Sequence, residues 1–92
     1  QQWIAEARAA GAVLHCGGEA VRAVLGPALL SGVPAEAKLA CEEIFGPVAI
    51  VEPFARFEDA LARANATRFG LQASVFTPRL EHALLAHRTL DY

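Results

Sequence analysis

The sequence lacks several features that whole classes of protein require. Its 92 residues include no methionine, one tryptophan, one tyrosine and two cysteines. Cys16 and Cys41 do not form a Cys-x-x-Cys pair, and a secreted domain of this size normally carries about four to eight cysteines. This composition excludes a disulfide scaffold, so we expect two buried free thiols.

Long apolar runs and an excess of one charge are also missing. No stretch reaches the roughly 20 apolar residues of a membrane span, and no charged-then-apolar leader opens the chain. The formal net charge is −2. The arginines are scattered: Arg8, Arg22, Arg56, Arg63, Arg68, Arg79 and Arg88. Without a basic face for phosphates, we expect a soluble, cytoplasmic protein that binds neither nucleic acid nor membrane.

What the sequence does contain is apolar enough for one small core, since 54% of the residues are hydrophobic and 20% are charged. There is no internal repeat, low-complexity tract or long linker. We therefore expect residues 1–92 to form a single segment with no internal boundary. The missing methionine and the start at Gln1 predict that this segment is internal to a longer protein.

The first half predicts a helix followed by short strands. Residues 2–10 are helix formers with Trp3, Ile4 and Ala7 on neighbouring positions, and residues 12–16 predict a buried strand.

Prolines punctuate the next stretch. Pro27 interrupts the apolar run 24–30, which predicts an edge strand or two short extended pieces. The residues between Val33 and Cys41 predict one or two helical turns.

The second half predicts strand, helix, strand, helix. Residues 48–54 and 71–76 read as strands, the first of them largely buried. Helical stripes follow each one: Phe57, Ala60, Leu61 and Ala64, then Leu80, Ala83, Leu84 and His87. Thr77 is the expected cap of the last helix, whereas Ala55 and Arg56 offer no cap to the earlier one. The alternation predicts an α/β fold, a parallel-sheet layer with flanking helices.

The segment Glu42–Val48, EEIFGPV, is the part of the chain most suggestive of chemistry. In an extended segment Glu43 and Phe45 share one side, and Ile44 points to the other side, into the core. A carboxylate beside a ring suits a nucleoside, because the carboxylate accepts hydrogen bonds from both ribose hydroxyls. The alternative is that Glu42 and Glu43 are solvated charges and Phe45 is an ordinary core residue.

Other polar residues favour structural roles. His15 and Cys16 are adjacent on a strand and face opposite sides, and His82 and His87 are five residues apart, so neither pair predicts a metal site. We expect His15 and Cys16 to be buried structural residues.

Three residues of the stretch NATRFGLQASVFT fit packing and turn roles. Asn65 can satisfy loop backbone groups, Phe69 can fill the core, and Gly70 is free of φ restriction.

Two motifs, EEIFGPV and NATRFGLQASVFT, resemble motifs of the aldehyde dehydrogenase superfamily in their residues and in their order along the chain. The resemblance extends over nearly the whole chain. It implies a segment of the catalytic domain of an enzyme that oxidises a small aldehyde to an acid with NAD or NADP. Glu43 matches the family's glutamate on the nicotinamide-side ribose, and Phe45 matches the aromatic residue near that ribose. The parent enzyme is expected to be a homodimer or homotetramer.

The resemblance assigns no catalytic residue to this chain. The family's nucleophilic cysteine belongs to an earlier motif, so Cys41 does not match it, and the chain alone is expected to be inactive. Two alternatives stay open: a stand-alone interaction or regulatory module that kept the fold, and a truncated chain that self-associates through unpaired strand edges.

Overall fold

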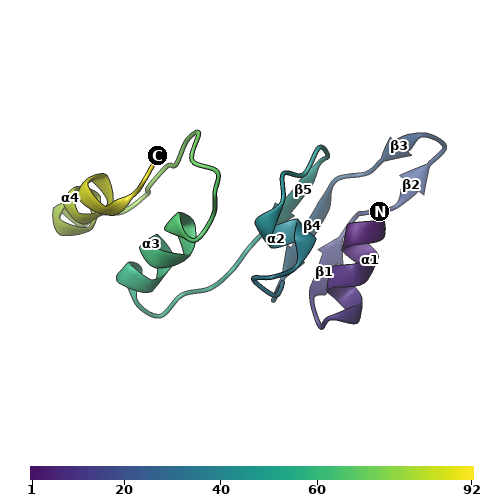
Figure 1. The fold of residues 1–92 in the computed structure, drawn as a ribbon, viewed down its shortest axis with the longest axis horizontal. Helices are drawn as coiled ribbons and strands as arrows, with labels where there is room; N and C mark the ends of the chain where they lie inside the picture. The colour runs from purple at the N-terminus through teal and green to yellow at the C-terminus, as the bar shows by residue number, and fades with distance from the viewer. The chain divides into compact units, whose positions relative to one another are not determined.

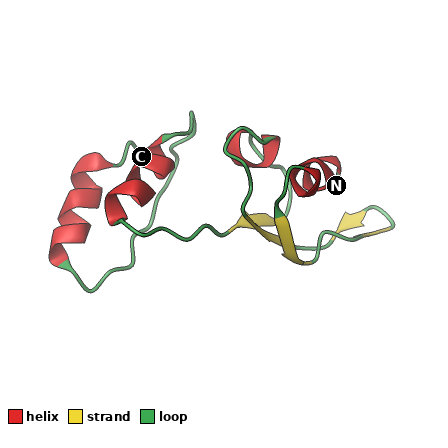
Figure 2. Ribbon diagram, turned by 90° about the horizontal axis from the view of Figure 1, so that it is seen from below, coloured by secondary structure: helices red, strands yellow, loops and turns green.

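The computed structural model describes all 92 residues and divides them into two compact units. The first unit is Gln1–Glu52 and the second is Pro53–Tyr92. Every strand belongs to the first unit, whereas the second contains helices and loops (Figure 1; Figure 2). The expected absence of an internal domain boundary stays a prediction, because one domain can contain two such units.

The first unit joins helices to a small mixed sheet. Its elements are α1 (Gln2–Ala9), β1 (Val13–Cys16), β2 (Ala20–Val21), β3 (Val24–Leu25), β4 (Ala28–Ser31), α2 (Lys38–Cys41) and β5 (Val48–Ile50). The main sheet has the order β1-β4-β5, and β2 pairs with β3 in a separate hairpin. The predicted helix at the start, the helical turn before Cys41 and the two extended pieces around Pro27 are confirmed.

The α/β class is confirmed, but the layer is not wholly parallel. β4 and β5 run parallel, with α2 between them in sequence, whereas β1 is antiparallel to β4. Parallel strands need a crossover connection, usually a helix, and β1 reaches β4 only through the β2–β3 hairpin. The chain therefore turns back on itself between β1 and β4.

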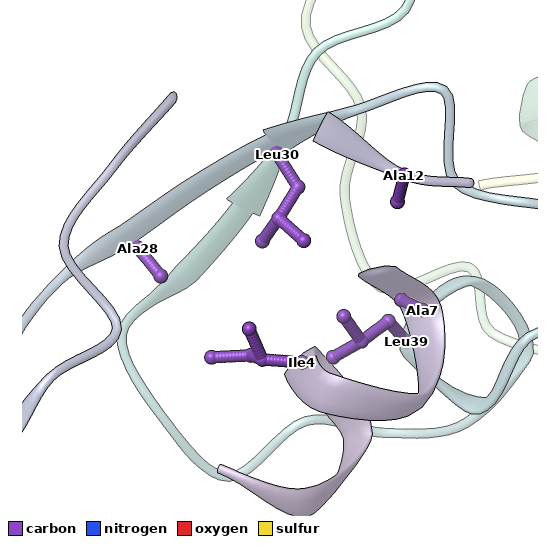
Figure 3. Close-up of a cluster of buried hydrophobic side chains, with 6 residues drawn as sticks. All are labelled: Ile4, Ala7, Ala12, Ala28, Leu30 and Leu39. Carbon is purple, nitrogen blue, oxygen red and sulfur yellow. The ribbon is translucent and has the colours of Figure 1, made fainter. Parts of the chain in front are cut away.

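The core of the first unit lies where α1 and α2 cover one face of the sheet (Figure 3). Its buried members are Ile4, Ala7, Ala12, Ala28, Leu30 and Leu39, and Leu30 has no exposed surface. On β4 the alternation places Ala28 and Leu30 inside. The parallel register sets them beside Val48 and Ile50 of β5.

The opposite face of the sheet corrects two predictions. Residues 12–16 and 48–54 were expected to be buried strands, yet Val13 is 53% exposed and Val51 is 56% exposed. The helices of the first unit pack on one face of the sheet, which leaves the middle residue of β5 and three of the four residues of β1 exposed.

The second unit contains α3 (Phe57–Asn65) and α4 (Leu80–Thr89). The predicted stripe of α3 is confirmed, because none of its four apolar residues is exposed and Leu61 is buried. The predicted missing cap is also confirmed, since Arg56 makes no side-chain capping hydrogen bond. No helix in the structure is long and apolar enough to cross a membrane.

The predicted face of α4 is wrong. Leu80 and Leu84 are 71% and 51% exposed, while Ala86 is 2% exposed. Several faces of α4 are apolar, so spacing alone does not choose between them. The ring of His82 stacks on Phe57 with 4.3 Å between centroids, and this contact turns the side of α4 that carries Ala86 inward.

The predicted strand at 71–76 is also absent, since these residues pair with no strand among the 92 described. The predicted start of α4 is displaced: Arg79 is the capping residue, and the Thr77 hydroxyl accepts a hydrogen bond from its backbone N–H at 3.2 Å.

Asn65 ties the end of α3 to the chain after α4. Its side-chain amide donates to the Thr89 carbonyl at 2.7 Å and accepts from the Asp91 N–H at 3.1 Å. A Cβ on Gly70 would lie 2.5 Å from the Asp91 carbonyl oxygen, so the backbones approach closely there. The architectural role of Asn65 is confirmed, whereas Gly70 has no positive φ and its small size is used for the close approach instead. Phe69 instead is 39% exposed, so it does not fill the core.

Two glycines offer a matched test of backbone fit. Gly17 and Gly32 both have left-handed φ, at +72° and +62°, but a Cβ on Gly17 would overlap the Pro27 carbonyl oxygen, whereas one on Gly32 meets nothing within 4 Å. We expect Gly32→Ala to cost about 1–2 kcal/mol and Gly17→Ala at least about 3 kcal/mol. Urea unfolding followed by Trp3 fluorescence measures both, and equal costs would contradict the close approach.

Candidate functional site

The segment from Glu42 to Pro47 leaves α2 and leads into β5, and its two ends are held by backbone hydrogen bonds. The N–H of Glu42 donates to the Lys38 carbonyl at 2.9 Å, closing the last turn of α2. At the other end the N–H of Ala28 donates to the Pro47 carbonyl at 2.8 Å. Glu42 itself is extended, with φ −112° and ψ 158°. The segment is therefore suspended between α2 and strand β4.

The side chains of this segment alternate as predicted. Glu43 is exposed, Ile44 is half-buried and packs against the core cluster, and Phe45 is 92% exposed. The alternative that Phe45 is an ordinary core residue is wrong. The ring of Phe45 is therefore accessible to another molecule.

A hollow of about 280 Å³ lies beside the segment. Its lining is Gln1, Trp3, Ile4, Leu25, Leu39, Glu43, Ile44, Phe45, Gly46 and Val48. Most of this lining is apolar, and Glu43 contributes a carboxylate. Ligand pockets begin at roughly 300 Å³, so the hollow fits part of a nucleotide, such as one sugar and its base, rather than a whole dinucleotide.

The structure brings together the two predicted site residues, since Glu43 and Phe45 line the same hollow. A carboxylate in this position accepts hydrogen bonds from two neighbouring hydroxyl groups, and an aromatic ring offers a flat apolar wall. This arrangement can hold a polyhydroxylated ring against an apolar surface.

An ion pair connects the two helices beside the hollow. The Lys38 ammonium on α2 lies 3.2 Å from the Glu6 carboxylate on α1, and the Gln2 amide donates to Glu6 at 2.8 Å. Hydrogen bonds from Gln2 and Lys38 hold the pKa of Glu6 below its ordinary value of 4.5. Sequence reasoning missed this pair, because the approach of Glu6 to Lys38 depends on how α1 and α2 pack.

The cysteines and His15 correct the expectation of buried side chains. Cys16 and Cys41 are free and exposed, and His15 is exposed on the same strand as Cys16. The Cys41 thiol donates to the Glu36 carbonyl at 3.6 Å. His15 Nε2 hydrogen-bonds the Ser31 hydroxyl at 2.7 Å. His15 lies on the uncovered face of the sheet, the register shift after Leu14 alters the pairing of Cys16, and Cys41 is the last residue of α2.

The remaining histidines belong to α4 of the second unit and do not line the hollow. His82 stacks on Phe57, and His87 is exposed on α4. No group of three or more His, Cys, Asp or Glu side chains is placed to hold a metal ion.

The family comparison covers the whole chain, since residues 1–92 match the model of the aldehyde dehydrogenase family. A similar curated protein is betaine aldehyde dehydrogenase of Cereibacter sphaeroides, 49% identical over 84 residues. That match takes in 88% of this chain and 17% of the relative. The chain thus spans about a sixth of the length of the curated relative.

Solved structures give the same result. Aldehyde dehydrogenase 21 of Physcomitrella patens, in complex with the reaction product succinate, superposes with a TM-score of 0.94 at 37% identity and covers 98% of this chain and 19% of that chain. Indole-3-acetaldehyde dehydrogenase in complex with NAD⁺ has a TM-score of 0.87 at 37% identity, covering 97% of this chain and 19% of that chain.

The Glu6 pair gives a pH-dependent link between α1 and α2. Because the pKa of Glu6 is lowered in the folded state, its stabilising contribution is present above the unfolded value and is lost as the pH falls through the lowered folded value. We expect Gln2→Leu and Lys38→Met each to raise the pKa of Glu6, because the first removes a hydrogen bond and the second removes a hydrogen bond and a positive charge, with Lys38→Arg as the conservative control. An NMR titration of the Glu6 carboxyl group measures this, and an unchanged pKa in Gln2→Leu would contradict it.

Proposed function

The chain belongs to the aldehyde dehydrogenase family, and on that premise we propose that it is a segment of an enzyme that oxidises an aldehyde to a carboxylic acid with NAD or NADP. Support comes from the curated relative, an aldehyde dehydrogenase, and from the solved relative in complex with NAD⁺. The substrate is proposed to be a small aldehyde. The full-length enzyme is proposed to be a cytoplasmic homodimer or homotetramer, as the family resemblance implies.

The observation that carries the proposal is the pairing of Glu43 and Phe45 at one hollow. In the proposed role the Glu43 carboxylate accepts hydrogen bonds from both hydroxyls of the nicotinamide-side ribose, and the exposed Phe45 ring packs against the sugar and the base. The donor and acceptor chemistry fits: a ribose has two neighbouring O–H donors, and a carboxylate is an acceptor-only group. The size of the hollow also fits one nucleoside.

The residues of this chain act by binding and orientation. When bound, the nicotinamide would supply the hydride acceptor for the oxidation, and Glu43 and Phe45 would hold its ribose. Holding its ribose between a carboxylate and a ring limits rotation of the nicotinamide, and limited rotation raises the fraction of molecules ready to react. No residue of this chain is proposed as the nucleophile, and Cys41, at the end of α2, is proposed to have no catalytic role.

Substitution of the pair tests the proposal in the full-length enzyme that contains this segment. Glu43→Gln keeps the shape but removes the charge, and Phe45→Ala removes the wall. Glu43→Gln is expected to raise the KM for the cofactor roughly ten-fold, because a hydrogen bond to a charged group contributes about 1.5–3 kcal/mol. Phe45→Ala is expected to raise it by a similar factor, because the apolar contact of the ring with the sugar and the base is lost. Initial rates against cofactor concentration, at saturating aldehyde, give the KM.

Two controls keep this result specific. Glu19→Gln removes the same charge from another exposed position of the first unit, and Phe45→Tyr keeps the ring; both are expected to change the KM by less than about two-fold. The proposed site is refuted if Glu43→Gln and Phe45→Ala behave like these controls.

A further inference from the structure

We propose that Ile44 is a positioning residue for the cofactor, fixing the direction in which Glu43 and Phe45 point. The proposal rests on the function proposed above. Ile44 lies between the two site residues in sequence and is the one residue of the four from Glu43 to Gly46 that is not exposed. Its side chain packs against the core cluster of the first unit.

The period of an extended segment explains why one buried side chain determines the direction of two others. Successive side chains point to opposite sides, so fixing Ile44 toward the core sends Glu43 and Phe45 away from it. A rotation or a slip by one residue would reverse all three. The bonds at Glu42 and Pro47 hold the two ends of the segment, and the contact of Ile44 with the core holds its middle.

The core around Ile44 comes from the neighbouring helices and strands. Ile44 lines the hollow together with Ile4 of α1 and Leu39 of α2, both buried core members. A Cβ added to Gly46 would lie 4.0 Å from Ile44 Cγ2 and 3.9 Å from Leu25 Cδ2, so the turn after Phe45 also lies against these side chains. Ile44 thus connects the site residues to the packing of both helices.

Cofactor binding depends on this contact because a carboxylate holds two hydroxyls only within a narrow range of positions. Binding constellations need a geometry kept to about 0.5 Å, and supporting residues supply that precision. Shortening Ile44 to alanine removes the core contact and leaves the carboxylate and ring chemically intact. We therefore expect a weaker hold on the cofactor and a smaller change in the rate of the reaction once it is bound.

The test compares Ile44→Ala with two matched variants in the full-length enzyme. Ile50→Ala makes the same change at a half-buried position of β5 packed against the same core cluster. Val33→Ala also shortens a side chain packed on this cluster, and Val33 does not line the hollow. Melting temperature, kcat and the KM for the cofactor are measured well below the melting point.

A positioning role predicts that all three variants lose stability, but Ile44→Ala raises the KM for the cofactor about five-fold or more while the other two raise it less than about two-fold. It also predicts that the effect of Ile44→Ala shrinks in a Glu43→Gln background, because no carboxylate is then left to position. Should Ile44→Ala fail to fold, Ile44→Val and Ile50→Val provide the same comparison with a smaller change.

Two outcomes overturn the proposal. Equal rises in the KM for Ile44→Ala and Ile50→Ala would make Ile44 an ordinary core residue. Full additivity of Ile44→Ala with Glu43→Gln would show that Ile44 acts independently of the carboxylate. Both differ from failure of the proposed function, in which Glu43→Gln and Phe45→Ala themselves leave the KM unchanged.

Discussion

The first unit depends on the burial of one face of its sheet by α1 and α2, centred on Leu30. Because β4 lies between β1 and β5, its inner residues touch both neighbours and both helices. The same packing holds α2, and α2 ends directly before Glu42. The position of Glu43 and Phe45, the candidate cofactor residues, is thus a consequence of apolar burial around β4. The core that supports them contains no buried polar residue.

Local patterns predicted those elements whose sequence offers only one apolar side. The stripe of α3 and the alternation from Glu43 to Phe45 follow from periods of 3.6 and 2, and both are present in the structure. The buried face of α4 did not follow in this way. Its sequence is apolar on several sides, and the contact between His82 and Phe57 joins two helices that are distant along the chain.

Burial was predicted less well than secondary structure, because burial also depends on contacts between segments that are distant along the chain. Cys16 and His15 lie on a strand that reads as apolar, but whether each side chain is buried depends on which sheet face is covered. The antiparallel direction of β1 likewise depends on the hairpin that follows it. The candidate site was predicted more completely than the fold around it. Glu43 and Phe45 are separated by one residue, so an extended backbone alone places their side chains on the same side of the segment.

The amide of Asn65 has a consequence for how the second unit comes apart. One side chain hydrogen-bonds residues 24 and 26 positions away along the chain, so it closes a non-covalent ring around the extended stretch and α4. Closing a ring of this size costs chain entropy once, and every contact formed inside it then requires less ordering. The Tyr92 hydroxyl, which donates to the Ala64 carbonyl at 2.8 Å, closes the same ring beside Asn65. We therefore expect the helix and the stretch before it to open together as one unit when these closing contacts are lost.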